Sequence, residues 1–216
     1  TLELAYRALY DREAVFHVTH ESRPFTARQV LGGRWGEALP TDRQGNLYLA
    51  GPAPDPCRGP ERRRKVMAVG KMPGDDEMRF GRGLIGRSGR LLRSVLEEYL
   101  VDPSDWYVSN ALRWPHPDPG SDAIPAEWTK TCLPLLRWEI ELVRPEFLFL
   151  FGSEALKGIL GTNQTAERCQ FRLIEHPFGD RVIKVMCAVN AAAVLRKPEY
   201  EYPFKKAVSG MAMAVT

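Results

Sequence analysis

The sequence predicts an α/β protein, a three-layer αβα sandwich built on a central, mostly parallel sheet of four strands. Two observations carry this prediction. From Lys65 onward, short apolar runs alternate with segments of helical periodicity, which is the pattern of repeated β-α-β units. The run at 146–151, EFLFLF, is apolar after its first residue, as is typical of a central strand covered on both faces. A chain of 216 residues can bury one sizeable core.

The first part of the chain follows another pattern. Residues 1–50 predict a helix over about Leu2–Val15, followed by mixed polar and apolar sequence. The next segment, GPAPDPCRGPERRR, is rich in proline and predicts a connector. We therefore expect an N-terminal helical or irregular extension, residues 1–56, and an α/β domain, residues 57–216.

The α/β domain is predicted to contain, in order, a strand at 65–70, a helix at 88–100, a strand at 105–112, a long helix at 125–145, the strand at 146–151, a helix at 153–161, two strands at 170–175 and 181–189 that flank a turn, and a last helix at 203–215. Pro134 should kink the long helix. Ser153 is the expected N-cap of the helix that it opens, and Gly161 is the expected C-cap.

Polar and glycine residues stand where four of the predicted strands end. These strand-end segments are Gly70–Gly74, Ser109–Asn110, Gly152–Ser153 and Asn190–Ala192. Because ligands of such sheets gather at the carboxyl ends of the strands, we expect the four segments to meet at one cleft.

The loop after the first of these strands combines glycine with positive charge. Six glycines fall between Gly70 and Gly89, and Lys71 stands where the strand opens into the loop. Between Arg58 and Arg93 there are eleven Lys or Arg residues and four acids, although the whole chain has a net charge of only +3. A basic block around a glycine loop indicates a polyanionic partner.

Four ordered blocks of the chain resemble the uracil-DNA glycosylase superfamily, especially its family 4 branch, which carries an iron–sulfur cluster. The similarity covers about Cys57–Pro198. The segment GKMPGDDEMRFGRGLIGRSGRLL resembles the family's G-E-[AG]-P-G and G-R-P-F-V-G-x-A-G-x-L-L motifs. The segments WYVSN, RPEFLFLFGSEA and NAAAVLRKP resemble the three later family blocks.

The resemblance implies a DNA-binding enzyme that surrounds a nucleotide flipped out of the duplex. Asn110 would pair with the O4 and N3–H edge of a uracil-type base. By the same resemblance, the other base-binding residues are Met72, Gly74 and Leu84. The DNA-binding residues that it implies are Pro73, Arg79, Arg82, Arg87, Gly152, Ser153, Leu195 and Arg196.

The residues that the family uses for hydrolysis differ in this chain. Lys71 replaces the glutamate of the first motif, and Asn190 replaces the closing histidine, which stabilises negative charge on the uracil carbonyl during cleavage. Leu84 replaces the stacking phenylalanine, whereas Glu77 matches a family acid. We take Lys71, Asn190 and Glu77 as the candidate catalytic residues, and we do not expect efficient uracil hydrolysis.

The cysteines predict neither a cluster nor another metal site. Cys57 and Cys132 match two of the four family ligands, but Pro54 and Trp114 occupy the other two positions. The four cysteines are scattered without a C-x-x-C pair, which fits buried thiols in a reducing cytoplasm, the host's cytoplasm if a phage encodes the chain. The sequence contains no apolar stretch of the ~20 residues that a membrane span needs.

Three functions stay open on these observations. The first is an enzyme that flips a uracil-type base and modifies it, for example by transferring an amino acid cosubstrate to activated 5-hydroxymethyluracil, as in phage thymine hypermodification. The second is a glycosylase for uracil or a 5-substituted uracil with a changed mechanism that uses Lys71. The third is a DNA-binding module without catalysis.

Overall fold

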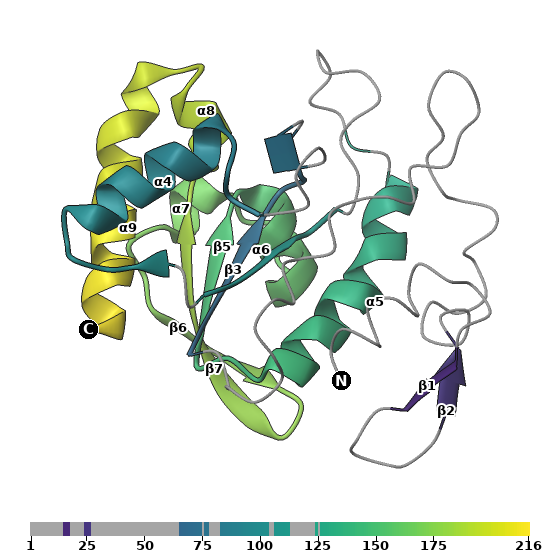
Figure 1. Ribbon diagram of the computed structural model, residues 1–216. Coiled ribbons are helices and arrows are strands. Elements are labelled where there is room, and N and C mark those ends of the chain that lie inside the picture. The colour runs from purple at the N-terminus through teal and green to yellow at the C-terminus, as the bar shows by residue number, and fades with distance from the viewer. Residues whose placement is uncertain are drawn as a thin grey trace.

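The computed structural model describes residues 15–17, 24–26, 65–74, 76–77, 83–103, 106–112, 124 and 126–216. Its main feature is a five-stranded sheet with the strand order β4-β3-β5-β7-β6 (Figure 1). The strands are β3 (Val66–Gly70), β4 (Tyr107–Asn110), β5 (Phe147–Phe151), β6 (Ile174–Phe178) and β7 (Arg181–Ala188). Strands β3, β4, β5 and β7 run parallel, and β6 pairs antiparallel with β7.

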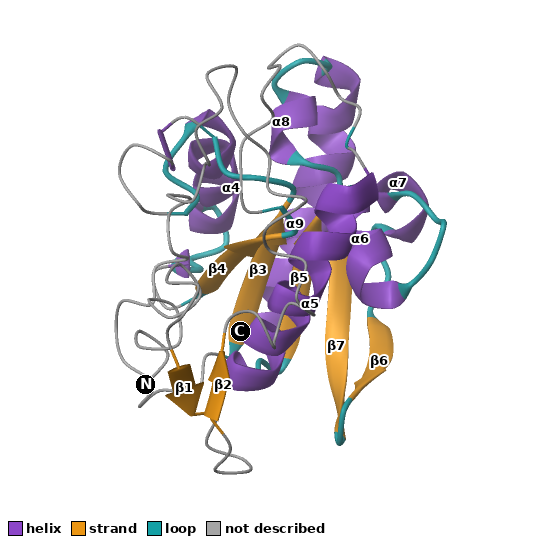
Figure 2. Cartoon of the chain, turned by 90° about the vertical axis from the view of Figure 1, so that its right-hand side faces the viewer, coloured by secondary structure: helices purple, strands orange, loops and turns teal. Residues whose placement is uncertain are grey.

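The predicted fold class is confirmed, but the predicted number of strands is corrected from four to five. The additional strand is β6, which the sequence predicts only as half of a hairpin. It extends the sheet because a two-residue turn at Gly179, whose φ is +59°, returns the chain directly alongside β7. Figure 2 shows this hairpin at one edge of the sheet and β4 at the other.

Helices cover both faces of the sheet and give the three layers. One core contains the inner sides of α5 (Ala126–Val143), α6 (Ser153–Leu160) and α7 (Ala166–Cys169). The opposite core lies under α4 (Arg87–Glu97), α8 (Ala191–Val194) and α9 (Glu201–Val215). A short 3-10 helix, η2 (Pro198–Tyr200), connects α8 to α9. In Figure 1, α4 and α9 lie on one side of the strands and α5 lies on the other.

Strand β5 lies at the centre, as its apolar sequence predicts. All five of its residues are buried, and β3 and β7 pair with it on either side. Its alternate side chains supply both cores, with Phe149 in the core under α4 and Leu150 in the core under α5. Full burial of such side chains contributes about 1.5–3 kcal/mol each.

One local prediction needs correction. The N-cap of α6 is Gly152 rather than Ser153, because the chain leaves β5 with a φ of +101°, which favours glycine. Gly161 is the C-cap as predicted, in the left-handed conformation. Helix α5 runs through position 134 as one helix of 18 residues.

The N-terminal region is described at only two short strands, β1 (Val15–His17) and β2 (Pro24–Thr26), which pair antiparallel with each other. Val15, the expected end of the first helix, begins β1 instead. The rest of that predicted helix and most of the extension over 1–56 lie outside the described residues.

Candidate functional site

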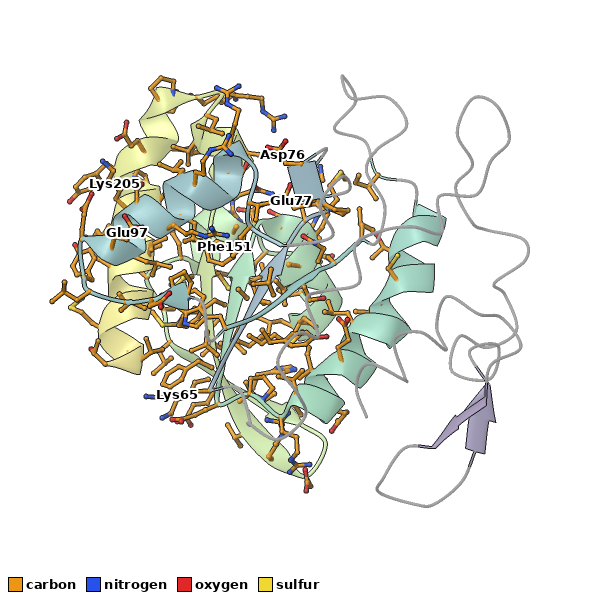
Figure 3. All side chains as sticks on the ribbon, viewed as in Figure 1. Lys65, Asp76, Glu77, Glu97, Phe151 and Lys205 are labelled. Carbon is orange, nitrogen blue, oxygen red and sulfur yellow. The ribbon has the colours of Figure 1, made fainter. Side chains whose placement is uncertain are left out.

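The carboxyl edge of the sheet collects most of the predicted site residues. Strands β3, β4, β5 and β7 all end there because they run parallel. The residues at this edge are Lys71, Met72, Pro73 and Gly74 after β3, Asn110 at the end of β4, Gly152 and Ser153 after β5, and Asn190 after β7. In Figure 3, Glu77 lies beyond this end of β3, and Lys65 lies at the other end. Arg79 and Arg82 lie outside the described residues.

Asn110 is held directly beside the backbone of β3. Its Cα pairs in register with Gly70, and a Cβ built on Gly70 would lie 2.7 Å from Asn110 Oδ1. Any side chain at position 70 would therefore displace the asparagine amide. The pairing continues past both strands, since Ala111 N donates to Gly70 O at 2.8 Å and Leu112 N donates to Lys71 O at 2.9 Å. Because Gly70 pairs with Asn110, Lys71 lies opposite Ala111, the residue that follows Asn110.

Gly83, at the described end of the glycine loop, packs against the face of β4 that carries Asn110. Val108 and Asn110 share that face, and a Cβ on Gly83 would lie 2.4 Å from Val108 Cγ1. Leu84 follows with a φ of +58°, and its carbonyl accepts a hydrogen bond from Arg93 Nη2 at 2.6 Å. Gly83 therefore packs against Val108, two residues before Asn110 on the same face, and a side chain at position 83 would collide with the valine.

The two apolar candidates for base contact pack on opposite sides of the sheet. Leu84 packs against the core under α4, and Met72 packs against the core under α5. Both side chains are partly buried.

Glu77 ties the two ends of the glycine loop together. Its Oε2 accepts a hydrogen bond from Gly74 N at 3.1 Å, and its Oε1 accepts one from Gly86 N at 2.7 Å. The side chain is largely buried, with 9 % exposure. These contacts give Glu77 a structural task in the loop, which the sequence prediction of a catalytic acid did not include.

Asn190 caps α8 and faces the loop after β5. Its Oδ1 accepts a hydrogen bond from Ala192 N at 2.9 Å, so its Nδ2 is the group left to donate. A Cβ on Gly152 would lie 3.7 Å from Asn190 Nδ2. The neighbouring Ser153 Oγ accepts a hydrogen bond from Ala166 N at 3.2 Å, which links α6 to α7 and leaves its proton available to donate.

The predicted wedge and phosphate residues lie on the surface. Leu195 follows α8 and is 42 % exposed, and Arg196 beside it is exposed as well. Arg87 is exposed at the start of α4, whose first turn contains no acidic residue. Anions are favoured at such a helix start.

One buried polar group was missed by the sequence analysis. Glu139 on α5 is fully buried, and Ser109 Oγ donates to its Oε2 at 2.6 Å. Burial raises the pKa of the Glu139 carboxyl well above its ordinary value. A signal was present in the sequence, because Glu139 interrupts the apolar stripe formed by Leu136, Ile140 and Val143 on the amphipathic helix.

The three cysteines that the structure describes, Cys132, Cys169 and Cys187, are all buried. Cys132 is packed in the core under α5 with 1 % exposure. Cys57, Pro54 and Trp114, which the prediction about the cluster also uses, lie outside the described residues. In the part of the chain that the structure describes, no group of three or more His, Cys, Asp or Glu side chains could hold a metal ion.

None of the described helices is both long enough and apolar enough to cross a membrane.

Comparison with known proteins identifies the family of the chain. The family model of the uracil DNA glycosylase superfamily matches residues 56–210. The chain therefore belongs to the uracil-DNA glycosylase superfamily, whose members act on DNA.

The relatives point to one branch of that superfamily. The chain is 27 % identical to the type-4 uracil-DNA glycosylase of Pyrobaculum aerophilum over 65 % of this chain and 73 % of that protein. It is 27 % identical to the type-4 uracil-DNA glycosylase of Sulfurisphaera tokodaii over 66 % of this chain and 68 % of that protein. It is also 28 % identical to a DNA polymerase of Bacillus phage SP01, over 79 % of this chain but 17 % of the polymerase.

Proposed function

We propose that this protein binds a uracil-type base flipped out of DNA and modifies it while the bond between base and sugar stays intact. One observation carries the proposal. The asparagine suited to the uracil edge is held against Gly70, whereas lysine and asparagine occupy the two positions where the family has a glutamate and a histidine.

Base reading depends on the amide of Asn110. A carboxamide offers an oxygen that accepts from N3–H of uracil and an NH₂ group that donates to O4. Cytosine presents the reverse pattern, so the same amide orientation disfavours it. The absence of a side chain at Gly70 leaves room for this amide at the end of the strand.

The change at Asn190 weakens hydrolysis. The negative charge that develops on a departing uracil needs a strong donor, and the neutral amide of asparagine adds no positive charge to that hydrogen bond, as a protonated histidine would. Loss of one such donor lowers the rate by about 10²–10³-fold in other enzymes. Glu77, the remaining family acid, is engaged by Gly74 N and Gly86 N. Efficient release of uracil is therefore not expected. We also do not expect a resident iron–sulfur cluster, because Pro54 and Trp114 replace two of the four cysteine ligands of the family.

Lys71 suits a transfer reaction at the 5-position. In this scheme the amine of an amino acid forms a C–N bond to the 5-methylene of phosphorylated 5-hydroxymethyluracil as the C–O bond to phosphate breaks. The phosphate leaves as an anion, and the newly bonded nitrogen of the amino acid gives up a proton to water. The Lys71 ammonium would stabilise the departing phosphate or hold the carboxylate of the incoming amino acid. The similarity to a phage polymerase is in keeping with a phage setting.

Mass spectrometry of the DNA tests the proposal. Duplexes that carry uracil, 5-hydroxymethyluracil or its phosphate are incubated with the protein and each of the common amino acids. We expect the phosphorylated base to lose its phosphate and gain the amino acid, so that its mass changes by that of the amino acid minus phosphoric acid. This product should be lost in Lys71→Ala while DNA binding persists. No adduct with any of the amino acids would contradict the transfer, and an activity unchanged in Lys71→Ala would contradict the role of Lys71.

The second candidate is excision of uracil or a 5-substituted uracil, which the similarity to two type-4 uracil-DNA glycosylases favours. In that case, Lys71 would attack C1′ of the sugar or stabilise the departing base. Alkali-labile nicking of a uracil-containing oligonucleotide would support it, with Asn110→Ala as the inactive control. If neither an adduct nor a nick forms but the DNA is bound, the third alternative, a non-catalytic module, is correct.

A further inference from the structure

A buried acid lies beneath the strand that carries Asn110. Glu139, on α5, has 0 % exposure, and Ser109, on β4, has 1 %. Ser109 Oγ donates to Glu139 Oε2 at 2.6 Å, and Tyr107 OH makes a longer contact of 3.4 Å with Oε1. Both β4 side chains that face α5 therefore contact one carboxyl group.

Strand β4 lies at the edge of the described sheet. Among the described strands only β3 pairs with it, so the ladder holds it from one side. The contact from Ser109 to α5 supplies a second attachment one residue before Asn110. Side chains alternate along a strand, so Ser109 is anchored below the sheet while Asn110 lies on the opposite face, beside Gly70.

We propose that Glu139 is a positioning residue, which fixes Asn110 over Gly70 by holding Ser109 and thereby sets the discrimination for a uracil-type base. The inference rests on the base reading proposed above. Its physical basis is the geometric demand of a paired base edge, because small displacements of a binding group reduce its effect strongly.

The chemistry of the group agrees with this role. Because desolvation raises the pKa of Glu139, the neutral acid is favoured, and it offers one donor and one acceptor to the polar groups around it. Glutamine has the same shape and the same two functions. Leucine fills a similar volume but leaves the hydroxyl of Ser109 without this acceptor.

The experiment compares two duplexes with the full chain. One carries 2′-fluoro-deoxyuridine, whose glycosidic bond resists cleavage, and the other carries a tetrahydrofuran abasic analogue in the same sequence. The dissociation constant of the abasic duplex divided by that of the uracil duplex measures how much the base adds to binding, separately from contacts with the DNA backbone. The variants are Glu139→Leu, Glu139→Gln, Ser109→Ala and Asn110→Ala, with Glu141→Gln as the control on an exposed position of the same helix.

We expect Glu139→Leu and Ser109→Ala to lower the ratio by about tenfold, the effect of one or two misaligned hydrogen bonds. The affinity of these variants for the abasic duplex should stay within about twofold of the wild-type value. Glu139→Gln should keep the wild-type ratio. If Glu139→Leu fails to fold, Ser109→Ala provides the same comparison with a smaller change.

Three results would overturn the inference. The ratio could stay at the wild-type value in both Glu139→Leu and Ser109→Ala, both duplexes could lose affinity equally, or Glu139→Gln could behave like Glu139→Leu. The Asn110→Ala variant separates this failure from that of the proposed function. A ratio that falls there but not in the others refutes positioning alone, whereas a ratio unchanged in Asn110→Ala refutes base reading itself.

Discussion

Replacement of Glu77 by alanine tests the structure of the glycine loop. The change removes the acceptor of two backbone N–H groups, that of Gly86 at 2.7 Å and that of Gly74 at 3.1 Å. Gly86 is buried, so its N–H would have no water to replace the carboxylate, whereas Gly74 is exposed and its N–H would be hydrated.

The size of the effect follows from this difference. A hydrogen bond to a charged group contributes about 1.5–3 kcal/mol, and we assign this amount to Gly86 and less than about 1 kcal/mol to Gly74. The free energy of unfolding should therefore fall by about 1.5–4 kcal/mol, which lowers the melting temperature of a chain of this size by roughly 3–16 °C. Glu77→Gln, which retains one acceptor oxygen for Gly86, should lose about half as much.

Thermal unfolding followed by circular dichroism measures the shift. Asp76→Asn is the matched control, because Asp76 makes only a 3.8 Å ion pair with Arg90 in which both side chains are about half exposed or more. Its effect should stay within about 0.5 kcal/mol. If Glu77→Ala melts as the control does, Glu77 does not hold the loop, and the assignment of a structural task to this acid is wrong.

Three other perturbations have defined outcomes. Gly89→Ala should cost at least about 3 kcal/mol in chemical unfolding, because its Cβ would lie 2.0 Å from Leu84 O, whereas Gly210→Ala, in another helix with 3.4 Å to the nearest atom, should be tolerated. Burial raises the pKa of Cys187 from 9.0 to about 12, so the thiol should resist alkylation in the native protein, and the stability it contributes below pH 9.0 should be lost as the pH rises towards about 12. Because the pKa of Glu139 is raised from 4.5, wild-type stability should decline as the pH rises above that value, and a stability advantage of Glu139→Gln that does not grow with pH in urea titrations would contradict this.

The three layers of the fold, and the edge of the sheet at which the candidate site residues gather, could be predicted from the sequence. The apolar run of β5 and the alternation of strands with helices follow from burial alone, so they are visible without coordinates. Gly70 and Asn110 were both predicted at strand ends, but their contact depends on the register between β3 and β4, which no local pattern contains.

The missed features depend on tertiary contacts. Ser153 has a side chain suited to an N-cap, yet the sharp turn out of β5 places Gly152 in that position. Glu139 resembles any charged residue of an amphipathic helix until α5 is packed against β4. Glu77 matched a family acid, and only the folded loop brings Gly86 within hydrogen-bond distance of it.

We have proposed that the site at the carboxyl edge of the sheet binds the pairing edge of a uracil-type base but lacks the glutamate and the histidine with which the family cuts the base from the sugar. The most direct test measures binding and release on one duplex with a single uracil, under conditions in which a type-4 uracil-DNA glycosylase completes the reaction. We predict tighter binding than to the matched cytosine duplex and no free uracil. Rapid release of uracil by the purified protein would contradict the proposed loss of hydrolysis.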